Sequence, residues 1–548
     1  MRFWGYEVKT DSICLNRGFS RIIDLRGVVF IHRLGVKAPF SHRRLTVPYT
    51  TDFCGKSRPG VLRSENPTAR YRESEFPPTE GLNAPERTEF EMDDSIIREN
   101  PPNPSNPRFR RYPEYKESGV EWIGRVPAHW KKSRLKYESL VPVQYGLNIN
   151  SDFYVEEGIR FIRTTDITDD GVLIDKGVYL KTESVEKIYL TQPNDFLISR
   201  SGTLGRVYLH QSDEEHTYGG YLVRFNFGCS IKSRFIFYFT KSRSFEHWIT
   251  LNTIQSTIGN VNGQKYSNLE IFLSSLSEQR QIVKFLDRKT KHIDELIRIK
   301  ERRIELLQEQ RTALINQAVT KGLDPNVEMK PSGVEWIREI PAHWKVKRLK
   351  HVAKILPSNV DKHIYPDEIQ VRLCNYTDVY YNDYITVDTV LEKGSCKESE
   401  FTKFVLRKGD VIITKDSETP DDIGVPTFVK DDLDNVVCGY HLTMIRPLVC
   451  RGEFVFRFIQ SDRTRRYFEV NSNGITRYGL GKASIENLLL PVPPDSEQRQ
   501  VADFLNHKTQ QIDELIAAEL RKIKLLKEYR QSLISEAVTG KIDVRNEV

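Results

Sequence analysis

Ser118–Lys136 has the sequence SGVEWIGRVPAHWKKSRLK, and Ser332–Lys350 repeats it as SGVEWIREIPAHWKVKRLK, with 14 of 19 positions identical. A second pair of segments, Ser277–Ile297 and Ser496–Ile516, begins with SEQRQ in both copies and shares 14 of 21 positions. Between these constant ends the two sequences differ. The chain therefore consists of two copies of one unit, which indicates a shared scaffold that carries two different modules.

The segments that follow the two SEQRQ sequences have the pattern of long helices. Apolar residues recur at spacings of three, four and seven, and both copies place them identically. So narrow an apolar stripe is typical of a coiled coil, and a helix of about 40 residues, roughly 60 Å long, needs a partner. We expect this partner to be the other copy; the alternative is two solvated helices that pack on neighbouring domains. The predicted seam residues are Ile293, Ile297, Ile304, Leu307 and Leu314 in the first copy and Ile512, Ile516, Ile523, Leu526 and Leu533 in the second.

The blocks between the constant segments alternate short β-branched or aromatic runs with turns, and each contains a predicted helix. Both blocks follow the same order of elements, which predicts one small α/β (α+β) fold that is used twice. We divide this part of the chain into a first module at 112–276, a central helix at 277–325, a second module at 326–495 and a C-terminal helix at 496–548.

The charge of the chain is distributed unevenly. The net charge is +7, but residues 1–111 hold 19 Lys and Arg against 14 Asp and Glu, so the remainder carries only +2. Global charge therefore gives almost no support for DNA binding, although it is compatible with a local basic patch. Residues 1–111 lack clear periodicity and end in a Pro-rich run. We expect a disordered extension here, or a true translation start at Met92.

Several classes of protein are disfavoured by what the sequence lacks. No run approaches 18 consecutive apolar residues, and the start does not have the apolar core of a secretory signal. The seven cysteines are scattered without a Cys-x-x-Cys pair, which argues against a disulfide framework and against a zinc site. We therefore expect a cytoplasmic protein without a membrane partner and without a metal site.

Motifs for catalysis are also scarce. Neither a Gly-x-Gly-x-x-Gly turn after a strand nor a Gly-x-x-x-x-Gly-Lys-Ser/Thr loop occurs. Asn100–Pro102 has the first letters of an amino-methyltransferase motif, but Asn103 follows where an aromatic residue must stack the flipped base. His129 and His343 stand beside Trp without an evident partner, and we interpret them as structural. The sequence predicts no catalytic residue.

The doubled motifs SGVEWI…PAHW…RLK and SEQRQ…KT…IDELI, together with NDFLIS and GDVIIT, resemble those of the specificity subunits of type I DNA restriction–modification enzymes. The resemblance covers about residues 112–548, and Asn194 departs from the pattern where the second copy has Gly409. It implies two target-recognition domains, each of which reads one half of a bipartite, asymmetric site in double-stranded DNA. It also implies two long antiparallel coiled-coil helices and a pseudo-twofold internal repeat.

The same resemblance implies partners. The helices would hold two modification subunits, which carry S-adenosylmethionine and the adenine-methylating site. Restriction subunits, with ATP and Mg, would join through the complex, and the chain itself would bind no cofactor directly. Two alternatives remain open: a scaffold whose two α/β modules bind protein rather than DNA, and a stand-alone DNA methyltransferase.

Polar residues with sufficient reach are candidates for DNA contacts. Arg and Lys can bind guanine, Asn and Gln can bind adenine, and hydroxyls and Lys can bind the backbone. In the first module we select Arg163, Thr164, Thr165, Arg200, Ser201, Lys265 and Tyr266. In the second module we select Asn375, Tyr376, Lys415, Arg477, Tyr478 and Lys482. Arg463, Arg465 and Arg466 beside Tyr467 form the densest basic patch, which we expect to contact phosphates.

Overall fold

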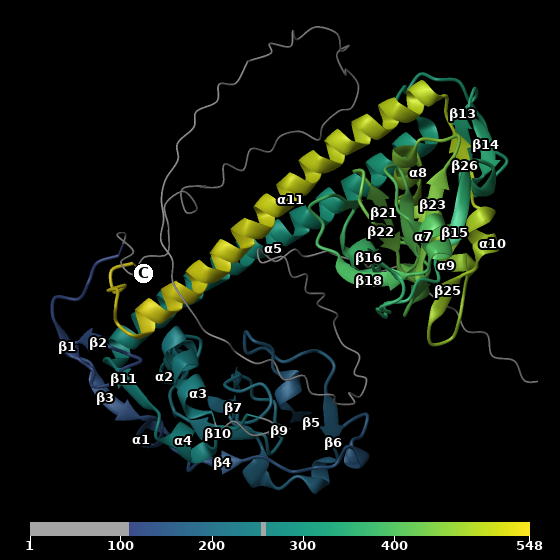
Figure 1. Ribbon diagram of the computed structural model, residues 1–548. Coiled ribbons are helices and arrows are strands. Elements are labelled where there is room, and N and C mark those ends of the chain that lie inside the picture. The colour runs from purple at the N-terminus through teal and green to yellow at the C-terminus, as the bar shows by residue number, and fades with distance from the viewer. Residues whose placement is uncertain (1–108, 254–258, 548) are drawn as a thin grey trace, which may run out of the picture. The chain divides into compact units, whose positions relative to one another are not determined.

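The computed structural model describes residues 109–253 and 259–547 (Figure 1). Of the extension predicted at 1–111, residues 1–108 and the alternative start at Met92 lie outside these residues. The described end of the extension is ordered, because Phe109 packs on Phe285 and Arg110 forms a β-bridge with Asp543. The described part of the chain contains two α+β modules and two long helices that pair with each other, which confirms the expected fold class.

The first module is built on two small sheets. The larger has the strand order β4-β10-β7-β8, and the smaller has the order β6-β5-β9, in which β5 and β9 run parallel. Two-stranded sheets, β1–β2 and β3–β11, flank them. The bounds are β1 Tyr115–Glu117, β2 Arg125–Pro127, β3 Lys131–Arg134, α1 Leu135–Glu138, β4 Gln144–Tyr145, β5 Ile159–Ile162, β6 Val178–Leu180, β7 Asp195–Ser199, β8 Val207–Leu209, β9 His216–Tyr218, β10 Leu222–Asn226, α2 Ser230–Phe239, α3 Arg243–Asn252, α4 Gly263–Ser267 and β11 Glu270–Leu273.

The second module repeats this topology. The order β15-β23-β19-β21-β17 extends the larger sheet by one strand, and β18-β16-β22 reproduces the smaller sheet with its parallel pair β16–β22. A three-stranded sheet, β20-β25-β24, is added at one edge. The bounds are β12 Met329–Pro331, β13 Glu339–Pro341, β14 Lys345–Arg348, β15 Ala353–Pro357, β16 Ile369–Cys374, α6 Tyr376–Tyr381, β17 Tyr384–Ile385, β18 Glu392–Cys396, α7 Glu398–Phe404, β19 Val411–Thr414, β20 Asp416–Ser417, β21 Pro426–Val429, β22 Val436–Cys438, β23 Leu442–Pro447, α8 Gly452–Ile459, α9 Asp462–Asn471, β24 Ser472–Asn473, β25 Tyr478–Leu480, α10 Lys482–Glu486 and β26 Leu489–Val492.

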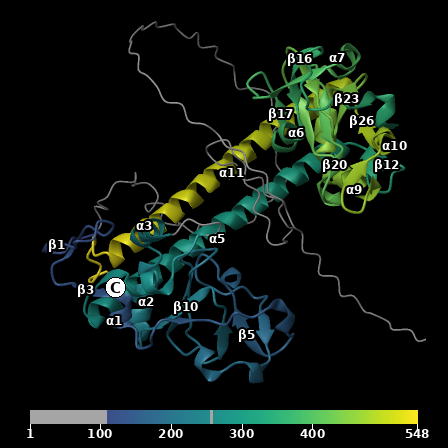
Figure 2. The ribbon, with the colours of Figure 1, turned by 60° about the horizontal axis from the view of Figure 1, so that its bottom comes forward.

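The two long helices are α5, Leu276–Lys321, and α11, Asp495–Val538, which lie side by side in Figures 1 and 2. Their 46 and 44 residues correspond to about 69 and 66 Å. Arg311 pairs with Asp513 at 3.3 Å, and Arg530 pairs with Asp294 at 2.8 Å. Higher numbers on one helix thus meet lower numbers on the other, so the helices are antiparallel.

The predicted seam residues lie on the inner side of this helix pair. Because their spacing keeps one apolar stripe on the same face of each helix, the stripe can be buried along most of the helix length. Ile293, Ile297, Ile304, Ile512, Ile523, Leu526 and Leu533 are buried, and Leu307, Leu314 and Ile516 are half-buried.

Within each copy of the repeat, the PAHW motif contacts the SEQRQ motif at the start of the long helix. In the first copy, Trp130 Nε1 donates to Glu278 Oε1 at 3.0 Å, and His129 Nε2 lies 2.8 Å from Glu278 Oε2. In the second copy, Trp344 Nε1 and His343 Nε2 make the same two contacts with Glu497, at 2.9 and 2.7 Å. The PAHW sequence therefore binds the carboxylate of SEQRQ. The sequence showed no partner for these histidines, but each has a carboxylate partner in the contact between the two motifs.

Each long helix ends against one of the two repeated segments Ser118–Lys136 and Ser332–Lys350, which we call the opening motifs. Gly322 follows α5 with φ +74°, and a Cβ there would lie 3.2 Å from the ring of Trp344. Gly540 lies just beyond α11 with φ +68°. A Cβ at this position would lie 2.3 Å from Pro127, so only glycine, which has no Cβ, fits there without a clash. The chain beyond α11 also returns to the first module, since Asp543 N donates to Arg110 O at 2.7 Å. The pairing of motif and helix end is thus made twice.

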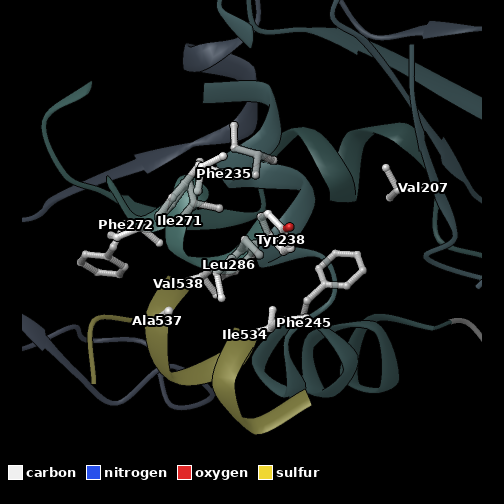
Figure 3. Packing of buried hydrophobic residues seen from close by; sticks show 14 of the residues in the cluster. Val207, Phe235, Tyr238, Phe245, Ile271, Phe272, Leu286, Ile534, Ala537 and Val538 are labelled. Atoms are coloured by element: carbon white, nitrogen blue, oxygen red, sulfur yellow. The ribbon is translucent and has the colours of Figure 1, made fainter. Parts of the chain in front are cut away.

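The hydrophobic core of the first module continues into both helices. Figure 3 shows Phe235 and Tyr238 of α2 beside Leu286 of α5, with Ile534 and Ala537 of α11 in the same cluster. The second core likewise combines module residues with both helices. Because each module packs on α5 and α11 together, the helix pair positions the loops of both modules.

Candidate nucleic-acid interface

Three loops meet at one edge of each module. In the first module, Gly219 N donates to Ile162 O at 2.9 Å, and Arg200 N donates to Tyr221 O at 2.9 Å. In the second module, Gly439 N donates to Cys374 O at 2.8 Å, and Lys415 N donates to His441 O at 2.9 Å. A fourth segment joins each edge, because Val261 N donates to Arg200 O and Leu480 N donates to Lys415 O. We call these sets the loop edges: 163–166, 200–202, 219–221 and 260–265 in the first module, and 375–378, 415–417, 439–441 and 477–482 in the second.

The first loop of each edge is closed by an aspartate. Asp166 accepts from the backbone N–H of Arg163 at 2.9 Å, and Asp378 accepts from the backbone N–H of Asn375 at 2.8 Å. The Arg163 guanidinium also bonds to Asp166, at 2.7 Å, and this hydrogen bond holds its pKa above the usual range. Thr164 is half-buried and Thr165 is exposed. Arg163 therefore braces the loop and leaves the threonines at the surface.

The second loop of each edge carries a cation. The guanidinium of Arg200 lies over the ring of Tyr145, 4.9 Å from its centroid. Such stacking holds the planar fork in one orientation. Lys415 occupies the equivalent position and donates from Nζ to Ser358 O at 2.9 Å. Ser201, beside Arg200, is 9% exposed. The two modules thus present different cations from one backbone framework.

Two predicted contacts at α4 have other roles. Tyr266 is 0% exposed, and its hydroxyl donates to Ser199 O at 2.8 Å. The prediction that Tyr266 contacts DNA is wrong, because its ring lies in the core against Trp248. Lys265 donates from Nζ to Asn252 O at 2.6 Å. It lines a shallow pocket of about 250 Å³ together with Trp248, Asn252, Asn262, Gln264 and Asn268.

In the second module, aromatic and basic residues gather around Tyr376. Its ring stacks on Tyr380 with centroids 5.6 Å apart, and burial raises its pKa to about 12. Arg477 is exposed and close enough to Tyr376 to act on it electrostatically. Tyr478 is half-buried in β25. Lys482 is exposed and pairs with Glu486 at 3.3 Å. The exposed cations of this edge are therefore Arg477 and Lys482.

The basic patch of α9 separates into two parts. Arg463 is half-buried and donates to the carbonyl of Trp336 in the opening motif, and burial lowers its pKa. This contact engages the Arg463 guanidinium with the scaffold, and the phosphate-binding role expected for Arg463 stays a prediction. Arg465 and Arg466 are exposed. These two remain candidates for phosphate contacts, and Tyr467 donates to Ser484 O at 2.9 Å.

The sequence interpretation missed residues on the third loop of each edge. Tyr221 is 63% exposed and Tyr440 is 46% exposed. His441 Nδ1 is hydrogen-bonded to Asp416 Oδ2. Outside these loops, Ile475 between β24 and β25 is 93% exposed. The recurring Gly followed by an aromatic residue in GGYL and GYHL was the available signal.

The described residues give no sign of a metal centre or a membrane segment. Within residues 109–253 and 259–547, no group of three or more His, Cys, Asp or Glu side chains could hold a metal ion. In the same part of the chain, no helix combines the length and the apolar content needed to cross a membrane.

Comparisons with known proteins relate both modules to one family. Residues 127–308 and 341–525 match the family model of the type I restriction modification DNA specificity domain. The type I restriction enzyme MjaVIII specificity subunit of Methanocaldococcus jannaschii is 24% identical over 317 residues, 57% of this chain and 71% of that protein. A second protein of this organism, provisionally named the MjaX specificity subunit, is 23% identical over 79% of this chain and 98% of its own length. A solved structure from a study of complex assembly in the type I R-M system has a TM-score of 0.57 at 15% identity, covering 75% of this chain and 98% of that chain.

Proposed function

Because the chain belongs to the family of type I restriction modification DNA specificity domains, we propose that its two modules read the two halves of one bipartite DNA site. The observation that carries this proposal is that both modules have the same backbone framework in their loops but different side chains at equivalent positions. Arg200 and Lys415 take equivalent places in it, as do Arg163 and Asn375. Base pairs differ in their pattern of donors and acceptors, so two half-sites of different sequence require different side chains on the same scaffold.

We propose that exposed residues of the loop edges make the base contacts, while α9 contributes phosphate contacts. Thr165, Arg477 and Lys482 are exposed at the edges, and Arg465 and Arg466 are exposed on α9. Phosphate contacts position a protein on DNA without reading its sequence. The loop edges would therefore determine specificity, and α9 would add affinity that decreases with salt.

The helix pair is the proposed docking surface for two modification subunits. Leu306 of α5 is 48% exposed, and Leu525, its equivalent on α11, is 47% exposed. Ile299 and Leu515 are also exposed on the same helices, at 37% and 45%. Apolar side chains that remain exposed in groups mark contact surfaces, and two equivalent positions suit two equal partners. These subunits would carry S-adenosylmethionine, and restriction subunits with ATP and Mg would join through the complex.

In this proposal the chain itself catalyses no reaction and binds no cofactor. The isolated protein should show no methylation, cleavage or ATP hydrolysis. We also propose a cytoplasmic location, in keeping with the five free cysteines among the described residues.

The proposal is tested by exchanging one module in the complex with the modification subunits. Residues 138–276 are replaced by the corresponding block of another specificity subunit, and adenine methylation is mapped across the genome. One half of the methylated sequence should change, while the other half and the spacing stay the same. Methylation in which both halves change together would contradict independent reading.

A further inference from the structure

The turns GGYL, Gly219–Leu222, and GYHL, Gly439–Leu442, occupy the centre of the two loop edges. Each connects the parallel strand of the smaller sheet, β9 or β22, to the strand of the larger sheet, β10 or β23. The first glycine of each turn, Gly219 or Gly439, donates its backbone N–H to the last residue of β5 or β16. The carbonyl of the third residue, Tyr221 or His441, accepts from the residue that follows β7 or β19. The two turns therefore lie between the first and second loops of their edges.

The backbone of the turns is held in nearly the same way in both modules. Gly220 N donates to Leu147 O at 2.8 Å, and Tyr440 N, the equivalent group, donates to Val360 O at 2.7 Å. Together with the bonds of Gly219 N and Gly439 N, these bonds occupy the first two main-chain donors of each turn. What differs between the two turns is the pair of side chains at their centre.

In the first module a glycine close to Asn148 stands at the centre of the turn, and the tyrosine after it projects from the surface. A Cβ at Gly220 would lie 2.1 Å from Oδ1 of Asn148. The next residue, Tyr221, is 63% exposed. Its phenol combines a flat apolar face with a hydroxyl that can donate or accept.

In the second module the turn carries a different constellation. Tyr440 stands where Gly220 stands in the first, and the next residue, His441, has φ +70°. This left-handed conformation is uncommon for a residue with a side chain, and such strain concentrates at functional positions. The bond from His441 Nδ1 to Asp416 orients the ring. Its remaining nitrogen is left to interact with a ligand, beside a half-exposed Tyr440 ring only 3.5 Å away between centroids.

We propose that these turns are specificity-determining elements: Tyr221 reads a base in the first half-site, and His441, oriented by Asp416, reads a base in the second. The inference rests on the proposed function and deepens it. A phenol and an imidazole offer different donors, acceptors and shapes to a base edge. The same place in the two modules would therefore select different bases.

The experiment uses the full chain in complex with its modification subunits. The complex selects duplexes from a randomised DNA pool, and the bound sequences are compared among variants. Tyr221→Leu should lower the preference at one position of the first half-site by about tenfold and leave the second half-site unchanged. His441→Asn should do the converse, and Asn is chosen because it tolerates the left-handed conformation. Asp416→Asn should weaken the same position as His441→Asn.

Matched controls come from the opposite end of β16. His363 is exposed and lies 3.4 Å from Asp361, so His363→Asn removes a surface His–Asp pair outside the loop edge. Tyr365→Leu removes a tyrosine that is 44% exposed. Both variants should select the wild-type sequence.

The outcomes separate the inference from the proposed function. If the wild-type complex selects no sequence, the proposed function is wrong. If it selects a bipartite sequence that the turn variants also select with unchanged preference, the turns are not readers. A uniform loss of affinity without a change at any base would assign them to the DNA backbone, and this result would also overturn the inference.

Discussion

Lys300 of α5 pairs with Glu519 of α11, with 3.2 Å between Nζ and Oε2, and the two residues occupy equivalent positions 219 residues apart in the two repeats. A residue that contacts its own equivalent lies on the pseudo-twofold axis. Identical repeats would place two like charges there. The side chains of Lys300 and Glu519 are 12% and 4% exposed, so the opposite charges meet in a largely buried position.

Reversing the charge of Glu519 should therefore destabilise the helix pair. Arg303 and Lys522 also contact Glu519, at 3.1 and 3.4 Å. Glu519→Lys would place a fourth cation among Arg303, Lys522 and Lys300, and breaking a buried pair costs about 3–5 kcal/mol. The measurement is denaturant unfolding of the full chain. Exchange of both charges, Lys300→Glu with Glu519→Lys, should recover much of the loss. A double variant as unstable as the single one would show that the pair does not act through its charges.

The two carboxylates that bind the PAHW motifs should differ in importance. The side chain of Glu278 is 7% exposed, whereas that of Glu497 is 33% exposed. Glu278→Gln replaces one of two acceptor oxygens with a donor that faces Trp130 or His129, and an unsatisfied buried group costs about 1–3 kcal/mol. Glu497→Gln is the matched control and should cost less, because water can reach the site. Unfolding midpoints of the two variants compare these effects, and equal losses would contradict the role of burial.

The first module should lose stability in mild acid. His210 and His216 pack with ring centroids 5.2 Å apart, and burial lowers the pKa of both below the ordinary value of 6.5. Asp195 and Glu214 oppose this shift, while Arg224 and Arg160 add to it. Because the unfolded chain binds these protons more readily than the folded chain, stability is complete above about pH 6.5 and falls as the pH decreases toward the folded pKa values.

The measurement for this pair is the unfolding midpoint between about pH 7.5 and pH 5.5. The double variant His210→Gln with His216→Gln should have a flatter profile than the wild type over this range. The control His363→Asn, at an exposed histidine of the second module, should follow the wild-type profile. A double variant that follows the wild type as well would exclude the buried histidines as the cause.

The helix pair should set the spacing between the half-sites. Four residues inserted after Glu309 alone would shift Arg311 away from Asp513 while Lys300 remains with Glu519. We therefore expect that insertion to destabilise the chain. A matched insertion of four residues after Leu515 as well lengthens both helices by about 6 Å. The spacing should then grow by about one to two base pairs, with both half-sequences unchanged. Methylation mapping in cells checks this, and an active double insertion with unchanged spacing would show that the helices are not the ruler.

The long helices and their seam could be predicted from the sequence because they depend on local periodicity. Ile293, Ile297 and Ile304 recur at spacings of four and seven, which place them on one helix face whatever surrounds the helix. The doubling of the motifs likewise indicated two modules, since equal sequences adopt equal folds. These features require only the order of residues along the chain.

The roles of the loop residues were decided by the tertiary structure alone. Tyr266 and Tyr221 both stand close to a glycine in the sequence, yet Tyr266 in α4 is buried against Ser199 and Tyr221 in its turn is 63% exposed. Asp416 meets His441 across 25 positions of sequence. Burial and partner choice depend on residues that are distant in sequence and are brought together by strand pairing, as β19 and β23 bring Asp416 to His441. Periodicity along the chain contains no information about such contacts, so the loop edges could not be derived from it.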